Sequence, residues 1–401
     1  VISKLFEPIP MTTEPVDWSF PTQMAVGPGR IAELPEFCQQ QGIRAPLIVT
    51  DPGLAALPMV AAIKTACDDA GMTSSVFADV QGNPTLENVE AGVVAFHAGD
   101  HDGVVALGGG SALDAGKAIA FASGQNRPLW DFVDVEDGWM LAKSEGIAPI
   151  IAVPTTAGTG SEVGRISVIT DSAQHQKRLV FHPQIQPSVV ILDPELTLSL
   201  PSHLTAATGM DALSHSLEAY CTPAFHPMAE GIALRGIRLT QQYLARAVHD
   251  GSDLEARTQL LVASSMGATA FQKGLGAMHA LAHPMGAHYN AHHGLLNAIV
   301  MPYVLHANRS AIEPKITELA RYLDLKDPSF DAFFDWVLNL RTEIGIAPRL
   351  LDIGIDDSDA KLIGEEAAVD PTAATNPIAF NPAQYSALFR NAVNGEFNPI
   401  S

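Results

Sequence analysis

The hydrophobic pattern of this chain changes once, near Leu200–Pro201, and this change constrains the fold more than any other feature. Before it, short apolar runs alternate with stretches of helical periodicity. The runs are Pro46–Thr50, Ser75–Val80, Gly103–Leu107, Pro149–Val153 and Ser188–Leu192, with helical patterns over Leu57–Ala70, Leu86–His97 and Ala112–Ala122. Strands that alternate with helices form βαβ units and a parallel sheet.

After Leu200–Pro201 the chain is rich in Ala and Leu and has almost no β-branched runs. Its periodicity predicts helices over Met210–Tyr220, Met228–Ala247, Leu254–Phe271 and Pro314–Leu323. We therefore predict a Rossmann-like α/β domain over residues 1–200 and an all-helical domain over residues 201–401. The acidic stretch Asp352–Asp370 is interpreted as a solvated face.

Composition narrows the classes of partner. The chain has 401 residues, with 23 Lys and Arg against 44 Asp and Glu, which gives a net charge of −21. A protein that binds nucleic acid needs a basic surface, so we expect no nucleic-acid partner. No apolar run is long enough to suggest a membrane span. Three cysteines far apart in the sequence favour a reducing compartment, hence a cytoplasmic location.

A run of three glycines stands between a predicted strand and a predicted helix, in Val104–Asp114. Glycines allow the backbone to approach a ligand closely, and the amides at the start of a helix can bind an anion. The spacing is neither G-x-G-x-x-G nor that of a P-loop. Ser111 and Asp114 also have the spacing of a capping box, so a tight turn before a well-capped helix explains the pattern equally well.

Two further polar segments follow predicted strands. Pro154–Glu162 is rich in glycine and hydroxyl groups, and ligands of parallel sheets bind where the strands end. Asp51 follows an early strand, where a carboxylate can accept hydrogen bonds from a ribose. An aspartate before Pro-Gly also commonly serves as a turn residue, and the sequence leaves both readings open.

Histidine is concentrated in one region: five of the 14 histidines lie between His279 and His293. His279 and His283 are four residues apart, as are Asp211 and His215, so each pair lies on one face of a helix. Pro284 is expected to end or kink its helix, and Ala291–Gly294 is expected to be a loop. Aspartate with histidines suits a divalent transition metal. The spacing does not say which histidines bind.

Four segments together resemble the group III, iron-dependent alcohol dehydrogenases: Gly108–Lys117, Pro154–Glu162, Ala207–Tyr220 and Gly274–Gly294. The resemblance covers nearly the whole chain. It implies a dehydroquinate synthase-like architecture, with the cofactor in the cleft between the two domains. It also implies an NAD-dependent enzyme that transfers hydride between NAD(H) and a small alcohol or its aldehyde or ketone.

The resemblance also implies roles for individual residues. The metal, Fe²⁺ with Zn²⁺ as the other option, would be held by Asp211, His215, His279 and His293. His283 would be a catalytic residue that does not bind metal and relays a proton. Asp51 and Asn83 would face the adenosine of the cofactor, and an aspartate at the first position favours NAD over NADP. The remaining cofactor contacts would be Gly109, Gly110, Ser111, Asp114, Thr155, Thr156, Thr159 and Lys177. A homodimer or a higher homo-oligomer is also implied.

Two alternative functions agree less well with the sequence. A lyase resembling dehydroquinate synthase would use NAD transiently, but it needs basic residues for a phosphorylated substrate, and the helical part is poor in lysine. A non-catalytic metal-binding protein would have no need of the glycine turn and the Pro154–Glu162 loop. The sequence does not identify the substrate.

Overall fold

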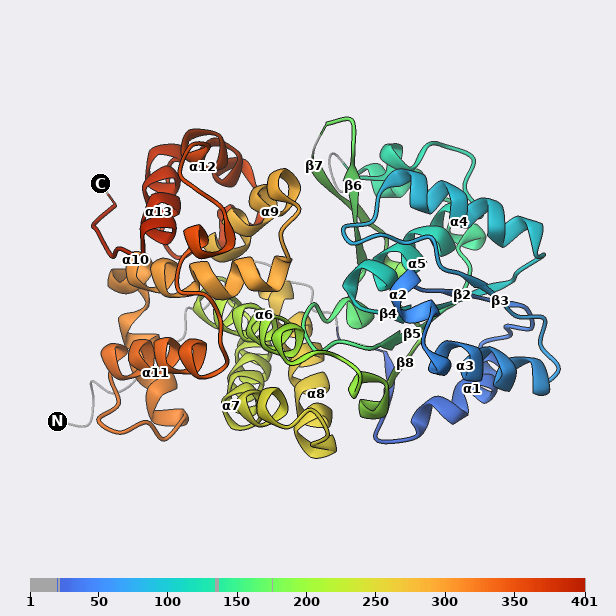
Figure 1. The fold of residues 1–401 in the computed structure, drawn as a ribbon. Helices are drawn as coiled ribbons and strands as arrows, with labels where there is room; N and C mark the ends of the chain where they lie inside the picture. The colour runs from blue at the N-terminus through green and yellow to red at the C-terminus, as the bar shows by residue number, and fades with distance from the viewer. Residues whose placement is uncertain (1–19, 21, 134–136, 175, 401) are drawn as a thin grey trace.

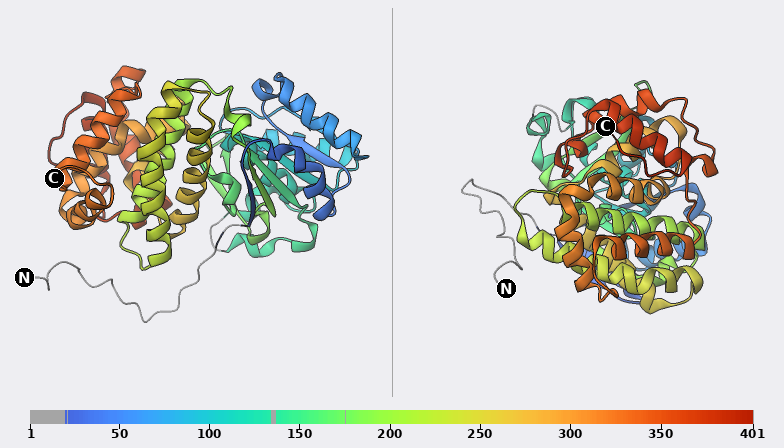
Figure 2. Two further views of the ribbon diagram at one scale, coloured as in Figure 1. Left: turned by 90° about the horizontal axis from the view of Figure 1, so that it is seen from below. Right: turned by 90° about the vertical axis from the view of Figure 1, so that its left-hand side faces the viewer.

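The computed structural model describes residue 20 and residues 22–133, 137–174 and 176–400. Residues 1–19 of the predicted first domain therefore lie outside the described residues. The chain folds into an α/β half, which contains the sheet, and a helical half beside it (Figure 1). The view from below also shows the two halves side by side, whereas in the view from the side the helical half lies in front of the α/β half (Figure 2).

The α/β half is built on a six-stranded, fully parallel sheet with the order β1-β8-β5-β4-β2-β3. Alternate residues of its inner strands enter two different hydrophobic cores, and for this reason the strands are continuous apolar runs. The strands are β1 (Gln23–Val26), β2 (Pro46–Val49), β3 (Ser75–Phe77), β4 (Gly103–Gly108), β5 (Ile150–Pro154) and β8 (Val189–Leu192).

Helices cover both faces of this sheet. The helices of this half are α1 (Leu34–Gln40), α2 (Pro52–Ala55), α3 (Pro58–Asp69), α4 (Leu86–Ala98) and α5 (Gly110–Ala122). In β4, Val105 and Leu107 pack in one core with α1 and α3. Val104 and Ala106 pack in the other core with α4, α5 and part of α8 (Leu254–Ala270), a helix of the second half.

An antiparallel hairpin stands between the halves, next to α9 (Ala277–Tyr289) (Figure 1). Its strands are β6 (Ile166–Asp171) and β7 (Gln176–Phe181), paired from Ile166↔Phe181 to Asp171↔Gln176. Neither this hairpin nor β1 was predicted from the sequence.

The second half contains the helices that were predicted. Those predicted over Met210–Tyr220 and Met228–Ala247 extend further at both ends. The one predicted over Pro314–Leu323 begins much earlier and ends at Tyr322, and the one predicted over Leu254–Phe271 ends at Ala270. Its helices are α6 (Ser202–Cys221), α7 (Pro227–His249), α8 (Leu254–Ala270), α9 (Ala277–Tyr289), α10 (His293–Tyr322), α11 (Phe330–Glu343), α12 (Ala360–Val369) and α13 (Pro382–Asn394). None of the helices formed by the described residues has the length and apolar character needed to cross a membrane.

Local predictions differ from the structure at three places. Gly109, and not Ser111, precedes the first residue of α5, so the expected capping box is absent there. Of the two outcomes expected for Pro284, the end of the helix is wrong, because Pro284 lies inside α9, which continues to Tyr289. The stretch expected as the loop Ala291–Gly294 is shorter, because α10 begins at His293.

The order of the strands determines where a ligand can bind. β3 pairs with one edge of β2, and the next strand in the chain, β4, pairs with the other edge of β2. The direction of the strand order therefore reverses here, and the ends of β2 and β4 form a topological switch point. Ligands of open α/β sheets bind at such points. β4 and β5 pair from Val104↔Ile150 to Gly108↔Pro154, so both strands end together beside the helical half.

Candidate metal and cofactor site

Four ligand atoms meet in the helical half. Asp211 and His215 from α6, His279 from α9 and His293 from the start of α10 each offer one atom, and these four atoms lie within 4.8 Å of one another. The first three side chains are buried, and that of His293 is 23% exposed. The structure therefore brings together the four residues that the family resemblance implies as ligands.

Close helix packing makes this convergence possible. A Cβ atom at Gly294 would lie 2.5 Å from the carbonyl oxygen of Ala207 and 3.0 Å from the Cβ of Asp211. Only glycine lets the first turn of α10 come this near to α6. His293, the preceding residue, is thereby brought to Asp211, with its Nε2 3.8 Å from the Asp211 Oδ1.

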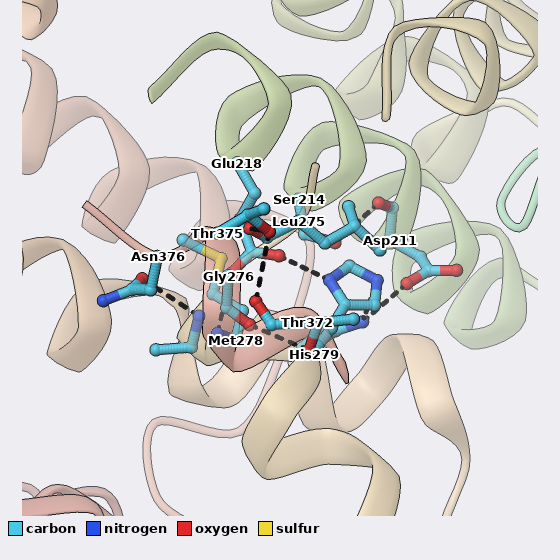
Figure 3. A network of polar contacts seen from close by, with 12 residues as sticks. Asp211, Ser214, Glu218, Leu275, Gly276, Met278, His279, Thr372, Thr375 and Asn376 are labelled. Atoms are coloured by element: carbon cyan, nitrogen blue, oxygen red, sulfur yellow. Dashed lines mark hydrogen bonds and ion pairs between the residues drawn. The ribbon is translucent and has the colours of Figure 1, made fainter. Parts of the chain in front are cut away.

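Glu218 fixes the orientation of His279 (Figure 3). Its Oε2 lies 2.6 Å from the His279 Nδ1, and its Oε1 accepts a hydrogen bond of 2.7 Å from the backbone N–H of Met278. A carboxylate is only an acceptor, so the His279 Nδ1 carries the proton and its Nε2 is free for a metal. Burial lowers the pKa of His279, but the charge and hydrogen bond of Glu218, together with the charges of Asp211 and Asp370, outweigh burial and the pKa is raised.

Asn297, one turn after His293, lies in the middle of the cluster. Its Nδ2 is 2.9 Å from the Asp211 Oδ1 and 3.2 Å from the Nε2 atoms of His279 and His293. Its Oδ1 is buried and has no hydrogen-bond partner among the described residues.

The donor set fits a divalent transition metal. Among the described residues, the buried Nδ1 of His215 has no hydrogen-bond partner. Burial lowers the pKa of His215 to about 4 and that of His293 well below its usual value, so both imidazoles are neutral at pH 7 and can bind a metal. One carboxylate and three imidazoles without a thiolate suit Fe²⁺ or Zn²⁺.

The glycine turn lies across from this cluster, at the switch point of the sheet. A Cβ at Gly110 would lie 2.6 Å from the Cγ2 of Thr159, and one at Gly109 would lie 3.4 Å from the Cγ2 of Thr156. Thr155 donates its backbone N–H to the carbonyl oxygen of Gly108, at 3.0 Å. The two segments predicted to bind the cofactor therefore form one surface, with the N-terminal amides of α5 at its centre.

Asp51 and Asn83 lie at the edges of the same surface. The Asp51 Oδ1 accepts from the Leu54 N–H at 3.0 Å, as a turn residue does, while its Oδ2 lies 3.7 Å from the position of a Cβ at Gly108. Asn83 donates its backbone N–H to the Ser111 Oγ at 3.3 Å. Its side chain reaches the helical half, where its Nδ2 donates to the Asn290 Oδ1 at 3.0 Å.

Asp114 faces the interior of the α/β half. Its Oδ1 accepts from the Ser161 Oγ at 2.5 Å and lies 3.0 Å from the buried ammonium of Lys117. Ser161 begins the short helix η5 (Ser161–Val163), which follows the threonine-rich loop. Asp114 thus ties the start of α5 to that loop.

Lys177 joins the two sides of the site. It stands on β7, and its Nζ lies 3.5 Å from the position of a Cβ at Gly286 in α9. Burial lowers the pKa of Lys177, while the charges of Asp114 and Asp211 oppose this effect. One ammonium group is therefore coupled both to the α/β half, through Asp114, and to the proposed metal cluster, through Asp211.

His283 lies beside the four-residue cluster without belonging to it. Its ring is stacked on that of His293, with centroids 5.5 Å apart, and its Nδ1 lies 2.8 Å from the Asp370 Oδ2. The interpretation of Asp352–Asp370 as a solvated face was wrong at its last residue, because the Asp370 side chain is only 10% exposed.

Glu218, Asn297 and Asp370 had no role predicted from the sequence. The first two could be found by extending the helical periodicity from the neighbouring ligands. Glu218 follows His215 by three residues and Asn297 follows His293 by four, so each lies on the ligand-bearing face of its helix. Asp370 has no comparable signal.

Known families match nearly the whole chain. A model described as "Iron-containing alcohol dehydrogenase" matches residues 21–194, and one described as "Fe-containing alcohol dehydrogenase family, C-terminal" matches residues 205–393. A 4-hydroxybutyrate dehydrogenase of Cupriavidus necator is 37% identical over 91% of this chain and 96% of its own length.

Solved structures are also similar to this chain over nearly its whole length. A crystal structure of a 1,3-propanediol oxidoreductase has a TM-score of 0.90 and 34% identity, covering 94% of this chain and 100% of that one. The sulfoacetaldehyde reductase of Bifidobacterium kashiwanohense, solved in complex with NAD⁺, has a TM-score of 0.85 and 28% identity, covering 94% and 98%.

A parallel sheet with a glycine turn, set against a helical half with an Asp-His₃ cluster, defines the chain as an oxidoreductase of the two-part, metal-dependent class. It belongs to the iron-containing alcohol dehydrogenase family.

Proposed function

We propose that this protein is an NAD-dependent alcohol dehydrogenase that requires a divalent metal, with Fe²⁺ as the first choice and Zn²⁺ as the second. The observation that carries the proposal is that Lys177 interacts both with Asp211 of the Asp211, His215, His279 and His293 cluster and with Asp114 of the helix that follows the glycine turn. When bound, the cation would polarise the substrate oxygen and the nicotinamide would exchange hydride with the adjacent carbon.

The chain's own residues would hold and orient the reactants. The N-terminal amides of α5, after Gly109, would receive the pyrophosphate, and the hydroxyls of Thr156 and Thr159 border the same surface. The free Oδ2 of Asp51 is available to a ribose hydroxyl and would repel a 2′-phosphate, which favours NAD. Lys177 would contact the cofactor where the two halves meet.

His283 would move the proton. Its Nδ1 is occupied by Asp370, and its ring lies beside His279 and His293 at the cluster, so the Nε2 is the nitrogen left for the substrate hydroxyl. Imidazole suits this task because its pKa lies near neutrality in water.

We further propose that the two functional domains meet near residue 200, that the enzyme acts in the cytoplasm and that it forms a homodimer or a higher homo-oligomer. The last strand ends at Leu192 and α6 begins at Ser202, which supports the domain boundary. The buried free thiols of Cys38, Cys67 and Cys221 suit a reducing compartment. Light scattering of the purified enzyme tests the oligomeric state.

The substrate is proposed to be a short alcohol, a diol or a hydroxy acid, since the relatives named above include a 4-hydroxybutyrate and a 1,3-propanediol enzyme. The test is anaerobic purification with metal analysis, followed by measurement of NADH formation over a panel of these three classes. A metal-loaded enzyme that binds NAD⁺ but forms no NADH with any of them would count against the proposal.

The ligand assignment predicts that His279→Ala loses bound metal and activity together. Removing one ligand should forfeit several kcal/mol of charge stabilisation, so we expect a decrease of about 10³-fold or more in kcat/KM. His97→Ala, on the exposed side of α4, is the matched control and should change neither quantity. Full metal occupancy in His279→Ala would refute the assignment.

A further inference from the structure

Two histidines of α9 share the same arrangement, although only one belongs to the metal cluster. His279 is bonded through its Nδ1 to Glu218, and His283 is bonded through its Nδ1 to Asp370 at 2.8 Å. The ring centroids of the two histidines are 5.9 Å apart. The carboxylate of Glu218 orients a proposed metal ligand, and the carboxylate of Asp370 has the same relation to a histidine outside the cluster.

Asp370 is held rigidly. It precedes the short helix η10 (Pro371–Thr375), and its Oδ1 accepts from the backbone N–H of Thr372 at 2.9 Å and from the Thr372 Oγ1 at 2.6 Å. Only the Oδ2 is left for His283. Burial raises the pKa of Asp370, but His283 and Thr372 outweigh it and the pKa is lowered, so the group is a carboxylate.

The segment that carries Asp370 is itself bound to the start of α9 (Figure 3). The Thr372 Oγ1 lies 3.3 Å from the carbonyl oxygen of Gly276, and the Thr375 Oγ1 donates to that of Leu275 at 2.8 Å. The Asn376 Oδ1 accepts from the backbone N–H of Ala277 at 3.0 Å. Residues 370–376 therefore hold both the beginning of α9 and the ring of His283 six residues further along.

From this geometry we infer that Asp370 is a positioning residue for His283, an inference that rests on the proposed dehydrogenase function. A carboxylate accepts only, so the proton of a neutral His283 is on Nδ1 and the lone pair is on Nε2. In alcohol oxidation, this Nε2 would accept the O–H proton of the substrate, while bound NAD⁺ would take up the C–H electron pair as hydride and a C=O bond would form. Asp370 would stabilise the resulting imidazolium.

The variant that tests this is Asp370→Asn. The amide oxygen can still accept from Thr372, but the amide nitrogen then donates toward the His283 Nδ1 and moves the imidazole proton to Nε2. We expect kcat to fall by about 10²-fold or more, within the range for loss of general base catalysis. Metal content and the Kd for NAD⁺ should stay within twofold. Asp356→Asn is the control, because Asp356 forms the same type of turn with Ser358 in the same acidic stretch but is exposed.

Two measurements distinguish an orienting role of Asp370 toward His283 from a merely structural role of Asp370. In the His283→Ala background, Asp370→Asn should cause no further loss of kcat. In Zn²⁺-loaded enzyme labelled with ¹⁵N-histidine, the His283 signals, assigned by their loss in His283→Ala, should show the Nδ1–H tautomer in the wild type and the Nε2–H tautomer in Asp370→Asn.

Several results would overturn the inference: an Nε2–H tautomer in the wild type, an undiminished kcat in Asp370→Asn, or an equal loss of kcat in the His283→Ala background. Loss of metal or of the fold in Asp370→Asn would also do so, because Asp370 would then act on α9 as a whole. Failure of the proposed function is distinct: no alcohol would yield NADH, while the tautomer could still be measured.

Discussion

The two sides of the proposed site, its α/β wall and its helical wall, are built by different means. The α/β wall presents main-chain amides and small side chains from segments that directly follow β4 and β5. The helical wall presents charged and aromatic side chains from three helices, and two of them, His279 and His283, are oriented by the carboxylates of Glu218 and Asp370. A backbone surface is therefore specified locally, whereas a ligand cluster depends on contacts that are distant in sequence.

The largest expected effect is a loss of metal affinity caused by a substitution in the helical wall, with NAD⁺ affinity left unchanged. In Glu218→Gln, one amide oxygen cannot accept from both the Met278 N–H and the His279 Nδ1, so the His279 ring should lose its fixed orientation. We expect metal to bind about 10-fold to 100-fold more weakly, with the Kd for NAD⁺ unchanged. Metal titration and NAD⁺ titration of the same protein measure both. Glu255→Gln, at an exposed position in α8, is the control. An equal weakening of NAD⁺ binding would break the distinction between the walls.

A smaller effect should appear on the opposite wall. In Gly110→Ala, the new Cβ would lie 2.6 Å from the Thr159 Cγ2, so Thr159 must move and the surface over the α5 amides becomes narrower. We expect the Kd for NAD⁺ to rise about tenfold, the cost of one modest clash, with metal content unchanged. Gly231→Ala serves as the control, since a Cβ there meets open space. Metal loss in Gly110→Ala would show that the walls are not independent.

The smallest expected effect is on the free energy of unfolding, and it arises at a contact between the α/β wall and the helical wall. Glu162 is buried and accepts from the Ser265 Oγ on α8 at 2.7 Å, and burial raises the pKa of its carboxyl. The folded state therefore holds this proton more tightly than the unfolded state, so the wild type loses stability as pH rises from about 4.5 through the folded pKa.

Glu162→Gln removes that titration. Its free energy of unfolding, measured by urea denaturation from pH 4 to pH 8, should increase relative to that of the wild type as pH rises, and the difference should level off above the folded pKa. Metal and NAD⁺ affinities should not change. A difference that is constant with pH would contradict the raised pKa of Glu162.

The same contrast explains what the sequence could predict. The strand, glycine turn and helix around Gly108–Lys117 are consecutive in the chain, and Asp211 and His215 share helical spacing, so both could be inferred from local patterns. The choice of ligands among the five histidines from His279 to His293 rested on the family resemblance. Asp370 had no such signal, because it is 87 residues from His283 and stands in an acidic run that resembles exposed aspartates such as Asp356. The hairpin that carries Lys177 was missed because its two strands form a sheet of their own, and the second strand is half polar.

The loop after β5 has a mechanical consequence. A Cβ at Gly158 would lie 2.8 Å from the Cβ of Thr208 in α6, and one at Gly160 would lie 2.2 Å from the Cβ of Ala268 in α8. Because neither glycine has a side chain, the loop lies directly against α6 and α8, and a larger residue at either position would push the halves apart at this seam. The exposed Asn83–Asn290 hydrogen bond is a separate contact between the halves. The seam is therefore specified by two positions without a side chain, whereas the second contact depends on two polar side chains.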